Sequence, residues 1–274
     1  MPRGNEKLRG WRCGVVVSAR DEEEVIGKCL ESLRGQTVRL FLVVVDDGSV
    51  DKTGEVASRY ADVVVDLPRH EESWAGRPEL ARVINAGFDV LKKRNVAYAL
   101  ISGADAVYPS NYVEEVIDRM KKGRGVVLAS GVAEGEVSRS LSPRGCGRVI
   151  DAEWFKEIGF KYPPNYGFEV YLVYKALSQG KNVAVFQDLK FELSRETRLS
   201  KRKLYVWGKG MKALNYWWLY AFGRAVLTGL RNPVGGYLML KGYLSKISLY
   251  GDIEGFVPCF QKKMFFERLR ELLF

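Results

Sequence analysis

The chain has 274 residues, 47% of them apolar, which is enough for one large domain or for one domain with an appendage. Four widely spaced cysteines without a CxxC pair and a single histidine give no sign of a zinc site or disulfide framework, and they leave acid chemistry to Asp and Glu. The net charge of +10 belongs to the C-terminal quarter, where residues 195–274 carry 15 Lys or Arg and 5 Asp or Glu.

The ends and the apolar runs of the chain argue against secretion and against a membrane span. The polar start is followed by an apolar run at 13–17 that is too short for a signal peptide. The longest apolar run of the basic tail, 213–223, is well below the ~18 residues that a spanning helix needs. We therefore expect a protein of the reducing cytoplasm.

The first half of the chain alternates short apolar runs with helical patterns. Apolar runs predict strands at 13–17, 40–45, 63–65 and 97–101. Helical spacing of apolar residues predicts a helix that begins at Asp21 as its N-cap, and further helices at 51–60 and 79–91. Continuous apolar strands separated by helices predict an α/β fold: a mostly parallel sheet with helices on both faces.

The second half is less regular. A Gly/Ser/Arg-rich link at 131–147 predicts a loop, and helices at 151–158 and 168–177 and a strand at 182–186 follow. From residue 195 onwards the chain is basic and aromatic. We predict an α/β domain at 1–198 and a helical region at 199–274.

Acidic residues follow two of the predicted strands, and ligands of such sheets collect where parallel strands end. Asp46 and Asp47 come after one strand, and Asp105 follows another. A diphosphate needs a divalent cation held by a carboxylate, a demand that Asp105 fits, and a nucleobase N–H needs an acceptor, which Asp47 can supply.

The order of four motifs resembles the family-2 glycosyltransferases of the GT-A fold over about residues 12–198. They are SARDEE at 18–23, VVVDDGSxDxT at 43–53, NAG at 85–87 and GAD at 103–105. The resemblance implies a nucleotide-sugar donor bound by Ser18, Arg20, Glu22, Asp47, Asn85, Gly103, Ala104 and Asp105. It also implies that Asp105 binds Mn²⁺ or Mg²⁺, although Gly103 stands where the family has a first acid. We also expect Arg77, next to Gly76 in a predicted loop, to reach the nucleotide.

The same resemblance implies roles for residues further along the chain. Glu169 falls where the family carries its general base, with Gly167-Phe168-Glu169 in place of Gly-Glu-Asp. Further along, FELSR at 191–195 together with Ser200-Lys201 resembles a segment of polyprenyl-phosphate mannosyltransferases. In those enzymes an Arg and a Ser-Lys pair hold phosphates. This implies phosphate contacts for Arg195, Arg198 and Lys201, and favours GDP-mannose over UDP-sugars as donor. A lipid-phosphate acceptor would need no base.

The basic tail concentrates aromatic residues with basic flanks at 209–230, and the segment 234–250 has a similar composition. Such segments are typical of helices that lie in a lipid headgroup region. We expect a peripheral, monotopic enzyme on the anionic cytoplasmic face of the membrane, with a lipid-linked or glycolipid acceptor. Nucleic-acid binding is the less fitting explanation, because the basic charge accompanies large apolar rings.

Simpler interpretations stay open. The VVVDDGS stretch could be a capped turn, Asp105 a turn residue, Glu169 a solvated side chain, and His70 a loop residue. A non-catalytic membrane-bound adaptor that binds nucleotide sugars is an alternative function. A nucleotidyltransferase fits poorly, because the acidic segment 18–24 lacks the Gly-rich basic loop of that class.

Overall fold

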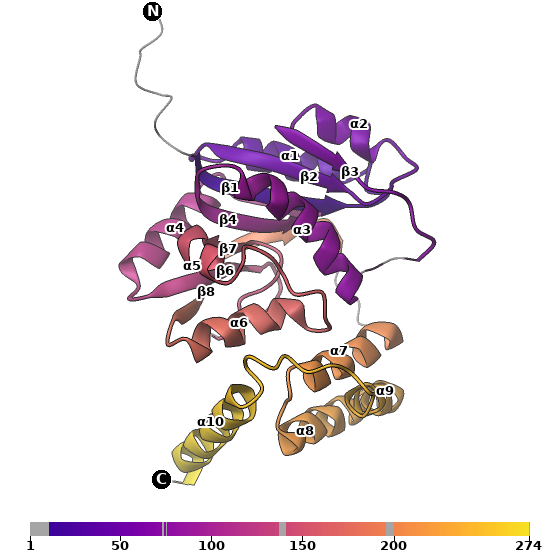
Figure 1. Cartoon of the computed structure of the whole chain (residues 1–274), viewed down its shortest axis with the longest axis vertical. Coiled ribbons are helices and arrows are strands. Elements are labelled where there is room, and N and C mark those ends of the chain that lie inside the picture. The colour runs from indigo at the N-terminus through magenta and orange to yellow at the C-terminus, as the bar shows by residue number, and fades with distance from the viewer. Residues whose placement is uncertain (1–10, 73, 75, 137–140, 196–199, 274) are drawn as a thin grey trace, which may run out of the picture. The chain divides into compact units, whose positions relative to one another are not determined.

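The computed structural model describes residues 11–72, 74, 76–136, 141–195 and 200–273, which form two compact units (Figure 1). The first unit comprises Met1–Ser73, Arg82–Tyr162 and Gly180–Glu196, and the second comprises Trp74–Ala81, Pro163–Gln179 and Thr197–Phe274. The predicted boundary at 198/199 falls outside the described residues. The second unit also takes the segment 163–179, because Tyr166, Tyr171 and Tyr174 pack on the apolar cluster of the tail.

The first unit contains an eight-stranded mixed sheet and its covering helices. Its elements are β1 (Trp11–Ala19), α1 (Ile26–Arg34), β2 (Leu40–Asp46), α2 (Thr53–Ser58), β3 (Val63–Asp66), most of α3 (Pro78–Lys92), β4 (Val96–Gly103), β5 (Ala106–Val107), α4 (Tyr112–Lys122), β6 (Val126–Ala133), β7 (Arg148–Asp151), α5 (Ala152–Glu157) and β8 (Asn182–Leu193). The strand order is β3-β2-β1-β4-β7-β6-β8-β5. The strands β3, β2, β1 and β4 are mutually parallel, whereas β7 is antiparallel to both of its neighbours.

Helices cover both faces of this sheet, as the continuous apolar strands predicted. Val15, Val17 and Val44 face one core cluster, which α1 and α4 complete. On the other face α3 packs against β1, because a Cβ on Gly87 would lie only 2.5 Å from a methyl carbon of Val16. Phe88 of α3 stacks edge-on with Phe155 of α5 on that side. The predicted α/β class is confirmed.

Two sequence-based expectations differ from the structure in the first unit. The first helix begins at Ile26, and Asp21 is not its N-cap, because Asp21 adopts φ 53° in a turn that precedes the helix. The strand predicted at 182–186 extends to Leu193, because its second half pairs with the end of β6 and with β5. This extension brings the end of β8 to the turn that follows β4.

The second unit is helical. Its elements are α6 (Phe168–Ser178), α7 (Lys201–Ala213), α8 (Trp218–Gly229), α9 (Pro233–Tyr243) and α10 (Phe256–Leu273). Asn232 caps α9 by accepting a hydrogen bond from the Gly235 backbone, and Pro233 suits the first helical turn. Within the described residues, none of these helices combines the length and apolarity that crossing a bilayer requires.

Candidate functional site

The ends of three neighbouring parallel strands define the candidate site in the first unit. Ala19 of β1 lies opposite Asp46 of β2, and Ser18 lies opposite Gly103 of β4. Because β1 runs between β2 and β4, Asp47 and the turn that carries Asp105 leave the sheet on either side of the β1 end. The backbone N–H of Asp47 donates to the carbonyl of Ala19 at 2.9 Å and ties the two strand ends together.

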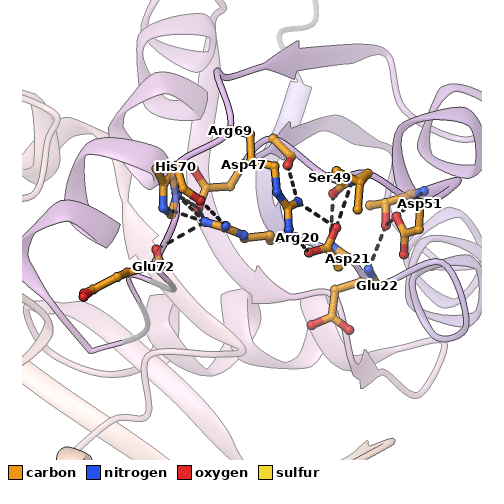
Figure 2. A network of polar contacts seen from close by, with 12 residues as sticks. Arg20, Asp21, Glu22, Asp47, Ser49, Asp51, Arg69, His70 and Glu72 are labelled. Atoms are coloured by element: carbon orange, nitrogen blue, oxygen red, sulfur yellow. Dashed lines mark hydrogen bonds and ion pairs between the residues drawn. The ribbon is translucent and has the colours of Figure 1, made fainter.

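Asp47 lies at the centre of a polar network with Arg20 and His70 (Figure 2). Its carboxylate is only 8% exposed, and its Oδ2 lies 2.8 Å from His70 Nε2 and 3.9 Å from Arg20 Nη1. Arg20 Nη1 lies 2.6 Å from both ring nitrogens, and its Nη2 donates to the His70 carbonyl oxygen. A carboxylate only accepts, so the tautomer that satisfies Asp47 is the one with hydrogen on Nε2, which leaves Nδ1 to accept from Arg20.

The other carboxylate oxygen of Asp47 has no partner. Oδ1 is buried and makes no hydrogen bond to any described residue. A buried acceptor without a donor is costly, by about 1–3 kcal/mol or more for a charged group, unless a ligand supplies the donor. The site therefore offers one fixed, unused acceptor at the carboxyl end of β2.

The rest of the DDGSxDxT segment holds the turn between β1 and α1. Ser49 Oγ accepts from the Asp21 backbone at 2.9 Å, and Thr53 Oγ1 accepts from the Glu22 backbone at 2.7 Å. Arg69 donates hydrogen bonds to both carboxylate oxygens of Asp21 at 3.1 Å, and these bonds lower the pKa of that carboxyl. These contacts explain the positive φ of Asp21 and fix where Glu22 stands.

Glu22, Asp105 and Arg195 make up the second half of the site. The Ser194 backbone N–H donates to the Asp105 carbonyl oxygen at 2.8 Å, so the end of β8 lies beside the turn after β4. Arg195 then forms a two-pronged ion pair with Glu22, with Nη1 donating to Oε1 at 3.2 Å and Nη2 to Oε2. Burial raises the pKa of Glu22, Arg195 opposes that shift, and the Asp105 charge adds to it.

Gly103 leaves room for the Asp105 side chain. A Cβ at residue 103 would lie 2.9 Å from Asp105 Oδ1 and 3.8 Å from Cys146 Sγ, so the carboxylate folds back over the glycine. The Gly103 backbone donates to the Cys146 thiol at 3.3 Å, and Ala104 is buried. Where the motif usually has its first acid, this chain thus has a glycine, and its lack of a side chain makes room for the Asp105 carboxylate.

A divalent cation fits this site only in part. No group of three or more Asp, Glu, His or Cys side chains is poised to hold a metal among the residues the structure describes. Asp105 supplies hard oxygen donors, and Mg²⁺ is commonly held by one or two carboxylates together with substrate phosphates. The residues present therefore suit a cation that arrives with a diphosphate.

The remaining residues of the sequence prediction lie elsewhere. The Asn85 amide pairs with the backbone of Tyr162, donating to its carbonyl at 2.8 Å and accepting from its N–H at 2.7 Å, so its observed contacts serve packing. Glu169 lies in the first turn of α6, Arg77 precedes α3, and Lys201 begins α7, all in the second unit. Arg198 falls outside the described residues. Contact of these side chains with substrates stays a prediction.

His70 is the residue that sequence reasoning missed. It lies in the irregular segment after β3, where no apolar period or motif marks it. The one available signal was that it is the single histidine of the chain, and it follows the strand next to the DDGS strand.

Comparison with known proteins places the chain among sugar-transferring enzymes. The family model for glycosyl transferase family 2 matches residues 14–177. A 4,4'-diaponeurosporenoate glycosyltransferase of Staphylococcus aureus is 38% identical over 64 residues, which are 23% of this chain and 17% of that relative. The chain thus spans less than a fifth of the length of this curated relative.

Solved structures show the same fold. S. aureus TarS 1-349 in complex with UDP matches with a TM-score of 0.54 at 16% identity, covering 72% of this chain and 63% of that one. The mannosyltransferase PcManGT from Pyrobaculum calidifontis, in complex with GDP-Man and Mn²⁺, matches with a TM-score of 0.58 at 16% identity, covering 86% and 72%. At these identities the likeness shows the fold alone.

Proposed function

Because the chain belongs to glycosyl transferase family 2, we propose that it transfers a sugar from a nucleotide-sugar donor to a lipid-linked or membrane-associated acceptor. The observation that carries the proposal is the buried, unpartnered Oδ1 of Asp47 at the end of β2. His70 and Arg20 hold the opposite oxygen, so Oδ1 is the oxygen of Asp47 that remains for a hydrogen-bond donor on a ligand.

A carboxylate oxygen that accepts a hydrogen bond at this position favours a nucleobase with a ring N–H. Guanine and uracil present such a donor next to a carbonyl, whereas the corresponding ring nitrogens of adenine and cytosine are acceptors. GDP-mannose is our first choice of donor and a UDP-sugar our second. The fold neighbours solved with GDP-Man and with UDP support both choices.

Asp105 would meet the diphosphate of the donor, and Arg195 would contact a phosphate. Asp105 would hold Mn²⁺ or Mg²⁺, which offsets the charge that builds on the departing nucleotide. Arg195 is already shaped for a two-pronged anion contact, because Glu22 occupies its fork, and a phosphate can take the place of that carboxylate. Exchange of one acidic partner for another keeps the guanidinium paired throughout.

Most of the residues that we propose for acceptor contact lie in the second unit. Glu169 would take the proton from an acceptor hydroxyl and direct an inverting displacement. Where the acceptor is a lipid phosphate, which is already a nucleophile, no base is needed. Arg195, Arg198 and Lys201 are the residues from which we expect contacts to phosphate.

A peripheral position on the cytoplasmic face of the membrane fits the surface of the second unit. Large apolar side chains on α8, on α9 and directly after α8 are exposed, among them Trp218 at 63%, Tyr237 at 63% and Leu230 at 77%. Basic side chains on the same helices suit anionic headgroups, which attract each Lys or Arg by about 1 kcal/mol. Amphipathic helices of this kind lie on a membrane without crossing it.

Calorimetric titration with GDP, UDP, ADP and CDP, with and without Mn²⁺, tests the proposal. GDP and UDP should bind to the intact protein, Asp47→Asn should weaken both, and Asp89→Asn should not. Asp89 is the matched control because it is exposed on α3, away from the strand ends. Absence of binding by all four nucleotides, or equal binding by the two variants, would overturn the proposal.

A non-catalytic adaptor is the second candidate, favoured by the lack of a three-acid metal group in the described part of the chain. Release of nucleotide from GDP-mannose or a UDP-sugar, in the presence of membrane lipid, distinguishes the two. Turnover that disappears in Asp105→Ala identifies an enzyme. Donor binding without any turnover identifies an adaptor.

A further inference from the structure

Lys209 on α7 is a half-buried cation that has no acidic partner in the part of the chain that the structure describes. Its Nζ lies 4.8 Å from the ring centres of both Tyr166 and Tyr205, and it donates to the Tyr166 hydroxyl at 3.3 Å. No carboxylate of the described residues lies within ion-pair distance of it. Lys175, on α6 of the same unit, is also partly buried and has Asp252 at 2.8 Å.

Two rings hold the Lys209 ammonium in place, so it is not a loose surface charge. Aromatic faces attract a cation but leave its positive charge uncompensated. The Tyr205 hydroxyl is itself fixed by Ser245 Oγ at 3.3 Å, and Ser245 Oγ in turn donates to the Lys241 carbonyl at 3.1 Å. The hydrogen bond to Ser245 lowers the pKa of Tyr205, and the charges of Lys209 and Lys241 add to that effect. The cluster is thus electropositive.

Backbone contact between α7 and α9 builds this cluster. A Cβ on Gly208 would lie 2.0 Å from the Met239 carbonyl oxygen, and one on Gly242 would lie 2.2 Å from the Tyr205 carbonyl oxygen. These two glycines let the helices touch, which brings Tyr205 of α7 to Ser245 just beyond α9. Gly210 of α7 also lies against Gly167, directly before the first turn of α6 that carries Glu169.

An exposed apolar stripe leads along α9 to the same cluster. Val234, Tyr237, Lys241 and Leu244 recur at helical spacing on one face, while Gly235, Met239 and Gly242 are buried on the other. Val234 is 49% exposed, Tyr237 63% and Leu244 71%. Apolar side chains that flank Lys241 match a molecule with a long hydrocarbon chain and an anionic head.

We propose that Lys209, with Lys241 and the Tyr166 hydroxyl, binds the phosphate of a lipid monophosphate whose chain lies along the exposed face of α9. The ammonium groups and the hydroxyl donate hydrogen bonds to the phosphate oxygens, and the charge of the anion offsets that of Lys209. This site rests on the proposed function in one respect, since its occupant is a lipid phosphate of the same chemical class as the proposed acceptor, bound at residues other than Arg195, Arg198 and Lys201. Its own contacts lie wholly within the second unit.

Flotation with lipid vesicles tests the site. The probes are phosphatidylcholine vesicles with 10 mol% phosphatidic acid, which carries a monophosphate head, and vesicles with phosphatidylglycerol at matched surface charge. The protein should prefer the monophosphate vesicles, and Lys209→Gln should lower its affinity for them about tenfold, the effect of removing one charge-assisted contact. Lys209→Arg, which keeps the charge, should retain most of the binding and shows that the fold tolerates change there.

Lys121→Gln is the matched control, because it removes the same charge from the exposed surface of α4 in the first unit. Equal losses in Lys121→Gln and Lys209→Gln, or equal binding of the wild type to the two kinds of vesicle, would overturn the proposal. Inorganic phosphate tests the source of the anion. If it binds as tightly as the lipid and is lost in Lys209→Gln, the site takes free phosphate and the lipid occupant is rejected.

Nucleotide titration separates this inference from the proposed function. Lys209→Gln should bind GDP or UDP as the wild type does, because Asp47 and Asp105 belong to the first unit. A protein that binds monophosphate vesicles through Lys209 but no nucleotide would refute the transferase and leave the lipid site standing. A protein that binds nucleotide but shows no dependence of vesicle binding on Lys209 would refute the lipid site alone.

Discussion

His70 Nε2 lies 2.8 Å from Asp47 Oδ2, although 23 residues separate the two in sequence. The contact holds one oxygen of a buried carboxylate, and the other oxygen, Oδ1, has no hydrogen-bond partner among the described residues. Arg20, from the end of β1, closes the network on the other side of the imidazole. A carboxylate held in this way keeps one orientation before any ligand arrives, which reduces the ordering that binding requires.

Removal of the imidazole should weaken nucleotide binding through loss of this orientation. We expect His70→Ala to lower the affinity for GDP or UDP about tenfold, the usual effect of losing one hydrogen bond to a charged group. His70→Gln, whose amide N–H can donate to Oδ2, should recover part of that loss. Guanosine and uridine should be affected in the same proportion as the diphosphates, because the contact concerns the base.

Calorimetric titration of the two variants checks this expectation. Arg59→Gln serves as the control, because Arg59 forms an exposed ion pair with Glu55 on α2. If His70→Ala and His70→Gln lose equal affinity, the hydrogen bond is not the cause. If only the diphosphates are affected, His70 acts on the phosphates and not through Asp47.

Replacement of Asp105 should separate the metal from the base. In Asp105→Asn we expect Mn²⁺ to lose its effect on GDP or UDP binding, because an amide is a poorer ligand for a hard cation than a carboxylate. Binding of the nucleoside, which has no phosphate, should be unchanged. Titration of diphosphate and nucleoside at several Mn²⁺ concentrations measures both, and persistence of the Mn²⁺ effect in the variant would assign the metal to other residues.

The acidic rim could be predicted from sequence because two simple rules place it. Apolar runs identify the strands that end near Asp46 and Gly103, and parallel order brings the carboxyl ends of strands to one edge. The family motif adds the identity of Asp47. Neither rule needs any knowledge of distant contacts.

The other half of the site depends on contacts that leave no periodic trace in the sequence. Arg195 reaches Glu22 across 173 residues because β8 continues past the predicted strand and pairs with β5. His70 follows β3 in a segment without regular structure. Ser49 and Arg69 hold Asp21 at a positive φ. An acid that resembles a helix cap in sequence therefore pairs with Arg69 in a turn before the helix.

The ionisation of Glu22 gives a pH dependence with a definite sign. Burial raises the pKa of Glu22 in the folded protein, so the folded state binds the carboxyl proton of Glu22 more tightly than the unfolded chain does. The contribution of Glu22 to the stability of the fold is therefore full at pH values below its unfolded pKa and is lost as pH rises through its folded pKa. We therefore expect Glu22→Gln to raise the melting temperature at pH 7 relative to the wild type, and to have a smaller effect at pH 4.

Thermal melts of both proteins between pH 4 and pH 8 measure this difference. Glu23→Gln is a suitable control, because Glu23 lies on the same turn and is exposed. A gain in melting temperature that is independent of pH would indicate a packing effect and not the charge. A loss at pH 7 would mean that the ion pair with Arg195 outweighs the burial of the carboxylate.

Gly208, on the helix that carries Lys209, should not tolerate a side chain. A methyl group there would lie 2.0 Å from the Met239 carbonyl oxygen, which is backbone and cannot move aside without separating α7 from α9. Overpacking of this kind typically lowers the free energy of unfolding by about 1–3 kcal/mol, and it exceeds the ~1 kcal/mol by which alanine is favoured over glycine within a helix. Gly223→Ala on α8 is the matched control, because its added methyl group meets no atom within 4 Å.

Urea denaturation should therefore show a lower midpoint for Gly208→Ala and an unchanged or higher one for Gly223→Ala. Separation of the helices also draws Tyr205 away from Ser245, so Gly208→Ala should bind monophosphate vesicles less well while its binding of GDP or UDP stays intact. Equal midpoints for the two variants would mean that the helices can part at no cost. The rigid placement of Lys209 would then have no structural basis.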